Sequence, residues 1–277
     1  MKVLVVSMKY DYGDPSRGLS YMDYYFEKPL TRVVDTVSFY DYMSMIKSMG
    51  RERMNQHLLA TIQRERPDVT IIVQSTDQFI PEVIDEINKY TISIGYYFDD
   101  MWRIEYSRFW ANHYTYVTTS DVNGIKKWQD IGCSNFIYSP FACNQEIYIR
   151  KKYAKIYDVS FVGQYHPYRA WCLRQIRKSG FKVYVWGHGW PAGRLDMEAM
   201  VTVFNKSKIN LNLSNNESWD FRYIFSLMRP VKETLHVAKN TIRATIKKDA
   251  KICEQVKARH FEINACGGFQ LSYFVEG

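Results

Sequence analysis

The chain has 277 residues, of which 46% are apolar and 24% charged, and its formal net charge is +8 at pH 7. This length exceeds the roughly 100–150 residues that are most common for one domain, so we expect two globular domains. No apolar run approaches the ~20 residues that a membrane span needs, and the first apolar run is too short for a signal peptide.

The composition also indicates in which cellular compartment the protein works and what charge its partners carry. The five cysteines are odd in number and have no C-x-x-C spacing, which argues against a disulfide framework and a zinc site. We therefore expect a cytoplasmic protein with reduced thiols. The positive charge favours anionic partners such as nucleotide phosphates, lipid head groups or nucleic acid.

The first half of the chain alternates short apolar runs with amphipathic stretches. Strands are expected at residues 2–7, 33–39, 69–73, 91–96, 114–119 and 135–138. Helices are expected at residues 51–66, 79–89 and 122–130, and another near Trp102. This alternation predicts a parallel sheet covered on both faces, as in doubly wound α/β domains.

Two acidic stretches fall where ligands of such sheets bind, beyond the carboxyl ends of strands. Asp14 lies in the loop after the first strand, and Asp99-Asp100 follows the strand at 91–96. The paired aspartates have three interpretations: a metal-binding motif, a catalytic or sugar-binding carboxylate, or a helix N-cap. With His113, these carboxylates are the candidates for a base that activates an acceptor.

The second half restarts the pattern after a break in the periodicity. Residues 143–156 are the best linker candidate, between a first domain at 1–142 and a second at 157–277. Strands are expected at 157–164, 181–186, 208–213 and 269–271, and helices at 168–178, 197–205 and 257–266. The Gly187-His188-Gly189 turn is not a dinucleotide fingerprint, because Pro191 follows it.

Two sites in this half suit an anionic ligand. Arg169 falls in the first turn of a helix, just after the strand that ends near Gly163, where a diphosphate could dock. The stretch KARHFEINACGGFQL places Arg259 and Glu262 on one short helix that Gly267-Gly268 stops. Such glycines let a ligand approach the backbone. The alternatives are a surface arginine and a surface ion pair.

Residues 221–252 hold most of the excess charge. Apolar side chains recur there at roughly helical spacing between lysines and arginines, which is typical of a basic amphipathic helix. One interpretation is adhesion to an anionic membrane surface, at the inner membrane face, and the other is a solvated helix packed on the core. No recognised motif for nucleic-acid binding accompanies the charge.

Several motifs together resemble one family. RHFEINACG resembles the R-x-F-E-(I/V)-x-A-x-G signature of CgeB-like glycosyltransferases, and SFVG followed by Arg169, the Asp99-Asp100 pair and GHGW resemble further pieces of it. The resemblance implies the GT-B fold class: α/β, with two Rossmann-like doubly wound domains that face a cleft. It implies a metal-independent transferase without a cofactor, whose donor is a nucleoside-diphosphate sugar of UDP or GDP type. The implied acceptor is a glycan, a lipid-linked molecule or a protein.

Roles carry over from this resemblance to individual residues. Glu262 is expected to bind the ribose hydroxyls, and Arg169, Arg259 and the amides of Gly267 and Gly268 to meet the diphosphate charge, with Gly163 and Gly187 beside them. Glu254 also stands eight residues before Glu262, as in many retaining GT-B enzymes. Relatives continue past position 277, so we expect the second domain to be incomplete. The alternatives are a non-catalytic relative with a scaffolding role, and an oxidoreductase, which the missing fingerprint disfavours.

Overall fold

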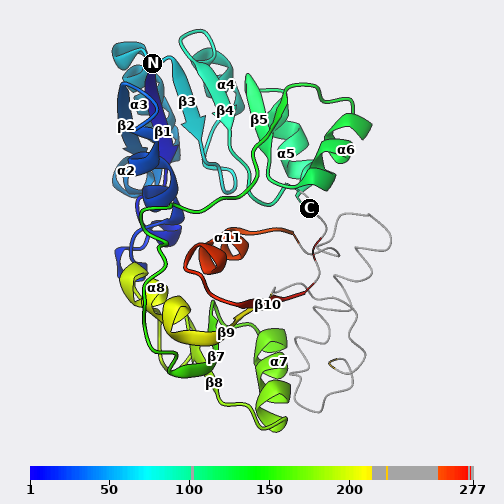
Figure 1. Cartoon of the computed structure of the whole chain (residues 1–277). Helices are drawn as coiled ribbons and strands as arrows, with labels where there is room; N and C mark the ends of the chain where they lie inside the picture. Colours follow the sequence, from blue (N-terminus) through cyan, green and yellow to red (C-terminus); the bar gives the residue numbers. More distant parts are fainter. Residues whose placement is uncertain (101–102, 214–222, 224–254, 274, 276–277) are drawn as a thin grey trace. The chain divides into compact units, whose positions relative to one another are not determined.

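The computed structural model describes residues 1–100, 103–213, 223, 255–273 and 275 (Figure 1). The chain divides into two compact units, Met1–Pro140 and Phe141–Gly277. Each unit holds one parallel sheet with helices between its strands, so the chain is an α/β protein with two Rossmann-like units.

The first unit contains a sheet of six strands in the order β2-β1-β3-β4-β5-β6. Its strands are β1 (Lys2–Ser7), β2 (Thr36–Asp41), β3 (Val69–Ile72), β4 (Ile92–Gly95), β5 (Tyr116–Thr119) and β6 (Phe136–Tyr138). Its helices are η1 (Asp11–Gly13), η2 (Pro15–Arg17), η3 (Asp23–Glu27), α1 (Lys28–Leu30), α2 (Tyr42–Met49), α3 (Arg51–Glu65), α4 (Pro81–Ile87), α5 (Ile104–Ala111) and α6 (Val122–Asp130).

Strand β1 lies at the centre of this unit. Its residues from Val3 to Ser7 are all buried, which a strand shows when both faces of its sheet are covered. Leu4 and Val6 join a core that includes Leu58 and Ile62 of α3. The strand order reverses between β1 and β3, because the chain leaves β1 toward β2 and later returns to the other side. Ligands of open α/β sheets bind at such a reversal.

The second unit contains a sheet of four parallel strands in the order β10-β9-β7-β8. Its strands are β7 (Tyr157–Val162), β8 (Val183–Trp186), β9 (Ser207–Asn212) and β10 (Gln270–Ser272). Its helices are α7 (Pro167–Lys178), α8 (Met197–Lys206) and α11 (Ala258–Ala265). Val159, Phe161 and Leu211 of the strands pack with Leu173 of α7 in a small core. Here the order reverses between β7 and β9.

Most expected elements are confirmed, and two differences have local causes. Strand β2 begins at Thr36 rather than at residue 33, since Val33 is exposed and Asp35 pairs with the amino group of Met1 at the end of a turn. Helix α2 was not expected. It follows β2 directly because the side chain of Asp41 accepts a hydrogen bond from the backbone N–H of Ser44 and so caps the helix.

None of the helices in the described part of the chain has both the length and the apolar character needed to cross a bilayer. The expected basic helix at 221–252 lies outside the described residues, apart from Tyr223, which packs on Tyr168 and Trp171 of α7.

The loop after β8 makes one very close backbone approach. Gly187 has a φ of +138°, and a Cβ placed on it would lie 1.9 Å from the carbonyl oxygen of Gly163. We expect Gly187→Ala to lower the free energy of unfolding by more than about 3 kcal/mol, since two backbone segments would have to separate. Urea unfolding followed by circular dichroism measures this loss.

Gly180→Ala is the matched control. Gly180 also has a positive φ, +90°, but a Cβ there would meet nothing within 4 Å. Its substitution should therefore cost only the backbone term, about 1–2 kcal/mol. Equal losses for the two variants would contradict the close approach.

Candidate functional site

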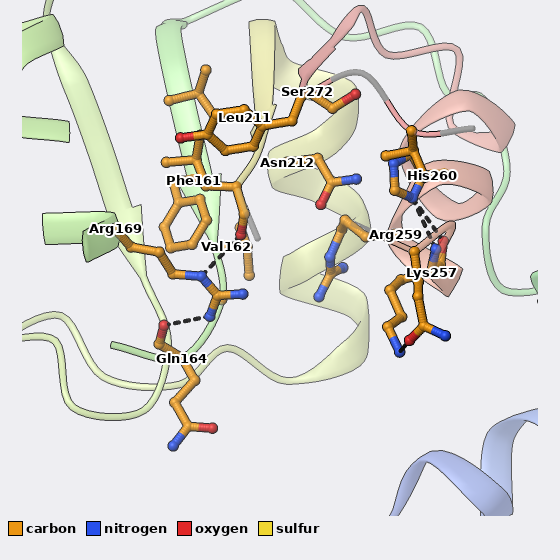
Figure 2. Close-up of a pocket in the computed structure, with 15 residues that line it drawn as sticks. Phe161, Val162, Gln164, Arg169, Leu211, Asn212, Lys257, Arg259, His260 and Ser272 are labelled. Carbon is orange, nitrogen blue, oxygen red and sulfur yellow. Dashed lines mark hydrogen bonds between the residues drawn. The ribbon is translucent and has the colours of Figure 1, made fainter. Parts of the chain in front are cut away.

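A cavity of about 250 Å³ opens at the carboxyl ends of β7, β9 and β10 in the second unit. It lies where the strand order reverses between β7 and β9. Figure 2 shows Arg169 on one side of this cavity, and Lys257, Arg259 and His260 on the other. We call it the cationic cavity, because three of its described lining residues are lysine or arginine and none is aspartate or glutamate.

Arg169 enters the cationic cavity from the first turn of α7. Its Nε donates to the carbonyl oxygen of Leu213 at 2.9 Å, and its Nη1 donates to that of Gln164 at 2.8 Å (Figure 2). These contacts hold the guanidinium between the ends of β9 and β7. A cation near a helix N-terminus opposes the helix dipole, so the two carbonyl groups, rather than α7, stabilise it.

The other two cations belong to the start of α11. Lys257 is its N-cap residue, and its backbone N–H donates to Nδ1 of His260 at 3.0 Å. The ammonium group of Lys257 donates to Oε1 of Gln255 at 2.7 Å. Arg259 follows in the first turn, with its Cζ 5.1 Å from the ring centre of Phe204. The short helix therefore carries two positive charges to the cavity wall.

Two amide side chains, those of Asn212 and Gln255, also line the cationic cavity. Nδ2 of Asn212 and Nε2 of Gln255 are buried, and neither has a hydrogen-bond partner within the described residues. The bond from Lys257 shows that the other atom of Gln255 is the oxygen, because an ammonium group can only donate. A buried donor without a partner costs about 1–3 kcal/mol. Cations and unsatisfied donors together suit an anionic ligand rich in oxygen.

Glu262 lies behind Arg259 and is not among the residues that line the cavity. The residue is 5% exposed, and its Oε2 lies 2.6 Å from Nη1 of Arg259. The hydroxyl of Tyr148 donates to its Oε1 at 3.1 Å. We expected this carboxylate to meet ribose hydroxyls, whereas the structure places it against Arg259 and Tyr148. A carboxylate at this depth needs such partners, since burying an unpaired charge is very costly.

The paired glycines differ from our expectation. The N–H of Gly267 donates to the carbonyl oxygen of Asn264 at 2.8 Å, and that of Gly268 to the carbonyl oxygen of Ile263 at 3.0 Å. A Cβ at Gly267 would lie 2.8 Å from Cδ of Arg150. The two amides therefore close the C-terminus of α11, as glycines at helix ends commonly do, and neither glycine lines the cationic cavity.

The other two glycines lie at the ends of β7 and β8. Gly163 lines the cationic cavity, and its carbonyl oxygen accepts a hydrogen bond from Nε1 of Trp190 at 3.0 Å. Gly187 does not line it, but packs against that same carbonyl group. Gly163 is therefore placed to contact a ligand. Gly187 packs behind Gly163 and supports the end of β7.

Two candidates in the first unit, His113 and Asp14, line neither the cationic cavity nor the cavity that Asp99 lines. His113 follows α5 and precedes β5, so it lies at the amino-terminal edge of the sheet, where its Nδ1 contacts Asp85 at 3.0 Å. The strands end at the opposite edge, and the role of His113 as a base stays a prediction. Asp14 follows β1 at the correct edge, but its carboxylate caps η2 by accepting from the N–H of Ser16 at 3.0 Å. Its role as a base stays a prediction.

Asp99 and Asp100 both line a second, smaller cavity, in the first unit. The two carboxylates have different surroundings. Asp100 is 1% exposed and accepts a hydrogen bond from Nε1 of Trp128 at 3.1 Å. Burial raises the pKa of this carboxyl group above its ordinary value. Asp100 thus holds α6 onto the sheet, which leaves Asp99 as the better candidate for ligand contact.

Sequence reasoning missed three residues of the second unit: Asn212, Gln255 and Lys257. Of these three, Asn212 could have been predicted, because it is a polar residue at the carboxyl end of a strand. Glu254 lies outside the described residues. Within the described ranges, no three side chains of His, Cys, Asp or Glu come together as metal ligands.

The second unit also matches a known family model. A model described as glycosyl transferase-like matches residues 169–277, which include all three cations of the cationic cavity. No curated protein matches the chain. Among solved structures, a protein described as a UDP-N-acetylglucosamine 2-epimerase, from Listeria monocytogenes, is similar with a TM-score of 0.47 and 11% identity, over 95% of this chain and 94% of that one. Such a distant likeness says nothing about the reaction.

The buried carboxyl group of Asp100 generates a prediction about pH. Because its pKa is raised, the folded state binds this proton more tightly than the unfolded chain, and the group's contribution falls as pH rises from the unfolded value through the folded one. Asp100→Asn cannot ionise, yet its Oδ1 can still accept from Trp128. Its stability relative to wild type should therefore increase as pH rises from 4 to 8.

Urea unfolding of both proteins across this range measures the difference. Asp14→Asn is the control, because Asp14 is exposed and its pKa is lowered by hydrogen bonds from Ser16. For that variant the relative stability should not increase with pH. A flat or falling curve for Asp100→Asn would show that the buried group is not penalised by ionisation.

Proposed function

We propose that this chain is a glycosyltransferase that takes a sugar from a nucleoside-diphosphate sugar, and that the cationic cavity binds the diphosphate. The observation that carries the proposal is the lining of this cavity: three cations, two unsatisfied amide donors and no carboxylate among its described residues. The match of residues 169–277 to a glycosyl transferase-like model supports it.

The chemistry explains why such a lining is useful. Transfer breaks the bond between the anomeric carbon and a diphosphate oxygen, so negative charge accumulates on the departing diphosphate. Donors that are held in place beforehand stabilise this charge more in the transition state than in the ground state. Arg169 is fixed by two carbonyl groups and Arg259 by Glu262, so neither has to reorganise during the reaction.

The finer assignments rest on the sequence motifs and on this charge. We propose a metal-independent enzyme of the CgeB-like group, because three cations can offset the charge of a diphosphate without a divalent ion. The donor is of UDP or GDP type and carries a hexose, and the acceptor is a glycan, a lipid-linked molecule or a protein. No further cofactor takes part in this scheme.

Binding of UDP or GDP tests the proposal directly. We expect isothermal titration calorimetry to detect one of them, and Arg169→Ala to weaken that affinity by a factor of about ten to one hundred, since a charge-assisted contact contributes about 1.5–3 kcal/mol. Lys178→Ala is the matched control, because it removes one positive charge from the last turn of the same helix, outside the cavity lining.

The control variant should bind within about twofold of wild type. Equal losses for the two variants would mean that the chain attracts nucleotides only through its net charge. Binding of NAD alone, or of no nucleotide, would overturn the proposal. Tight binding of UDP or GDP without transfer or hydrolysis of any donor sugar would instead favour the non-catalytic scaffold.

The position of Glu262 makes a second prediction, which separates two roles of this carboxylate. If it acts by holding Arg259, Glu262→Gln should weaken the binding of UDP and of 2′-deoxy-UDP by the same factor, about five- to twentyfold. If it bonds to ribose instead, wild type should prefer UDP, and Glu262→Gln should lose that preference. We expect the first result, since Glu262 contacts Arg259 and lies outside the cavity lining.

A double-mutant cycle with Arg259→Ala completes this test. Once Arg259 is absent, removing the charge of Glu262 should have almost no further effect on nucleotide affinity. Additive losses would show that the two residues act independently.

A further inference from the structure

The amino-terminal edge of the second sheet is formed by the segments that lead into its strands. All four strands are parallel, so they begin at the same edge, opposite the cationic cavity. Residues 150–158 lead into β7, residues 175–183 into β8 and residues 203–208 into β9. We call these three segments together the basic edge. They hold nine lysines and arginines, and Asp158 is their one acidic residue.

Contacts between neighbouring segments join the basic edge into one surface. The backbone N–H of Ile156 donates to the carbonyl oxygen of Lys206 at 2.9 Å, which connects the segments before β7 and β9. On the other side of β7, Val159 lies beside Val183 of β8. Because Ile156 and Phe181 precede these two valines by three and two positions, both reach the same edge on neighbouring strands.

Part of the positive charge on the basic edge serves the fold. Nζ of Lys155 donates to the carbonyl oxygen of Asn205 at 2.8 Å, in the last turn of α8. Cations at the C-terminus of a helix offset the helix dipole. Lys208 forms an ion pair with Asp158 at 2.6 Å. Since Asp158 offsets only one of the nine cations, the basic edge keeps most of its positive charge.

Large apolar side chains stand among these cations. Ile156 and Phe181 are each 54% exposed, and Tyr153 is 40% exposed. The ammonium nitrogen of Lys206 lies 5.1 Å from the ring centre of Tyr153, and Lys182 directly follows Phe181 in the chain. Helix dipoles account for cations at this edge, whereas leaving apolar side chains in water does not stabilise the second unit. Exposed apolar side chains that are gathered with charges mark an interaction surface.

Three kinds of partner could cover such a surface, and two of them fit it poorly. A second copy of the chain would bring like charges together. Nucleic-acid sites favour arginine and flat rings that stack on bases, whereas seven of the nine cations are lysines and Ile156 has no flat face. An anionic bilayer suits both features. Apolar side chains enter its headgroup region, and the flexible lysine stems place their ammonium groups at the lipid phosphates.

We propose that the basic edge docks the second unit onto an anionic membrane surface. Ile156 and Phe181 enter the headgroup layer, and the lysines around them face the lipid phosphates. The cationic cavity opens at the opposite edge of the same sheet, so the inference does not depend on the proposed function. It is also separate from the expected basic helix at 221–252, which lies outside the described residues.

Flotation of the full chain with lipid vesicles tests this docking. We expect binding to vesicles of equimolar phosphatidylglycerol and phosphatidylcholine, and at least about tenfold weaker binding to phosphatidylcholine alone. Lys182→Gln should lower the partition coefficient about fivefold, which is the contribution of one basic residue near an anionic surface. Phe181→Ser should lower it about tenfold, because a large apolar side chain no longer leaves water.

Matched variants separate docking from net charge and from general hydrophobicity. Lys126→Gln removes one positive charge from α6 of the first unit, and Phe109→Ser removes a ring of α5 that is 53% exposed. Both should bind vesicles within about twofold of wild type. Phe181→Ser should keep the melting temperature of wild type, because the ring that it removes is largely exposed.

Four results would overturn the inference. Three concern vesicles: no binding of anionic vesicles, equal binding of neutral and anionic vesicles, and binding that Phe181→Ser and Lys182→Gln leave unchanged. The last of these would assign membrane binding to another part of the chain. The fourth is tighter binding of single-stranded poly(U) than of vesicles, weakened by the same two variants, which would assign the basic edge to nucleic acid.

The outcomes also distinguish this inference from the proposed function. A chain that binds UDP or GDP but no vesicles would remove the docking surface alone. A chain that docks on anionic vesicles through Phe181 and Lys182 but binds no nucleotide would remove the proposed function and leave the docking surface.

Discussion

The second unit depends on one buried ion pair, between Glu262 and Arg259 on the same face of α11. The carboxylate of Glu262 is 5% exposed and lies 2.6 Å from Nη1 of Arg259, and removing one partner of such a buried pair would leave the other charge uncompensated. The hydroxyl of Tyr148 joins the same carboxylate and ties the segment after Phe141 to this helix. The pair thus fixes both the helix and the direction of a guanidinium at the cavity wall.

The two units place their cavities at equivalent points, but they line them differently. In both sheets the cavity lies where strand order reverses, at the carboxyl ends of the strands. In the second unit, arginines and a lysine gather there. In the first, aromatic rings and offset charges do. Backbone topology therefore sets where a ligand binds, and the side chains at a few strand ends set which charge it carries.

Much of this arrangement could be predicted from the sequence, because it follows from local patterns. Apolar β-branched runs gave the strands, and their alternation with helices gave two parallel sheets. Arg169 could be found because it falls where a helix begins after a strand end, and Arg259 because its motif resembles that of CgeB-like glycosyltransferases. The edge at which His113 lies also follows from the order of elements, since a residue between a helix and the next strand lies at the amino-terminal edge of the sheet.

What could not be predicted depends on contacts between distant segments. The backbone N–H groups of Gly267 and Gly268 donate to carbonyl oxygens at the end of α11. No sequence pattern distinguishes such glycines from glycines whose N–H groups are free to bind a ligand. Glu262 is buried by Tyr148, which lies more than one hundred residues away. The hydroxyl of Tyr97 has no described partner, whereas those of Tyr42, Tyr106 and Tyr114 donate to the segment after β3. The sequence does not show which of these hydroxyls is bonded.

Unsatisfied donors in both units have a practical consequence. A protein that folds with Gln255, Asn212 and Tyr97 lacking described partners gives up part of its conformational stability while the sites are empty. Any molecule that binds the folded state through those groups stabilises it by RT ln(1 + [L]/Kd), and so raises the melting point with its free concentration and affinity. Heating the chain beside a library of sugars and nucleotides would therefore rank its natural ligands before any reaction has been observed.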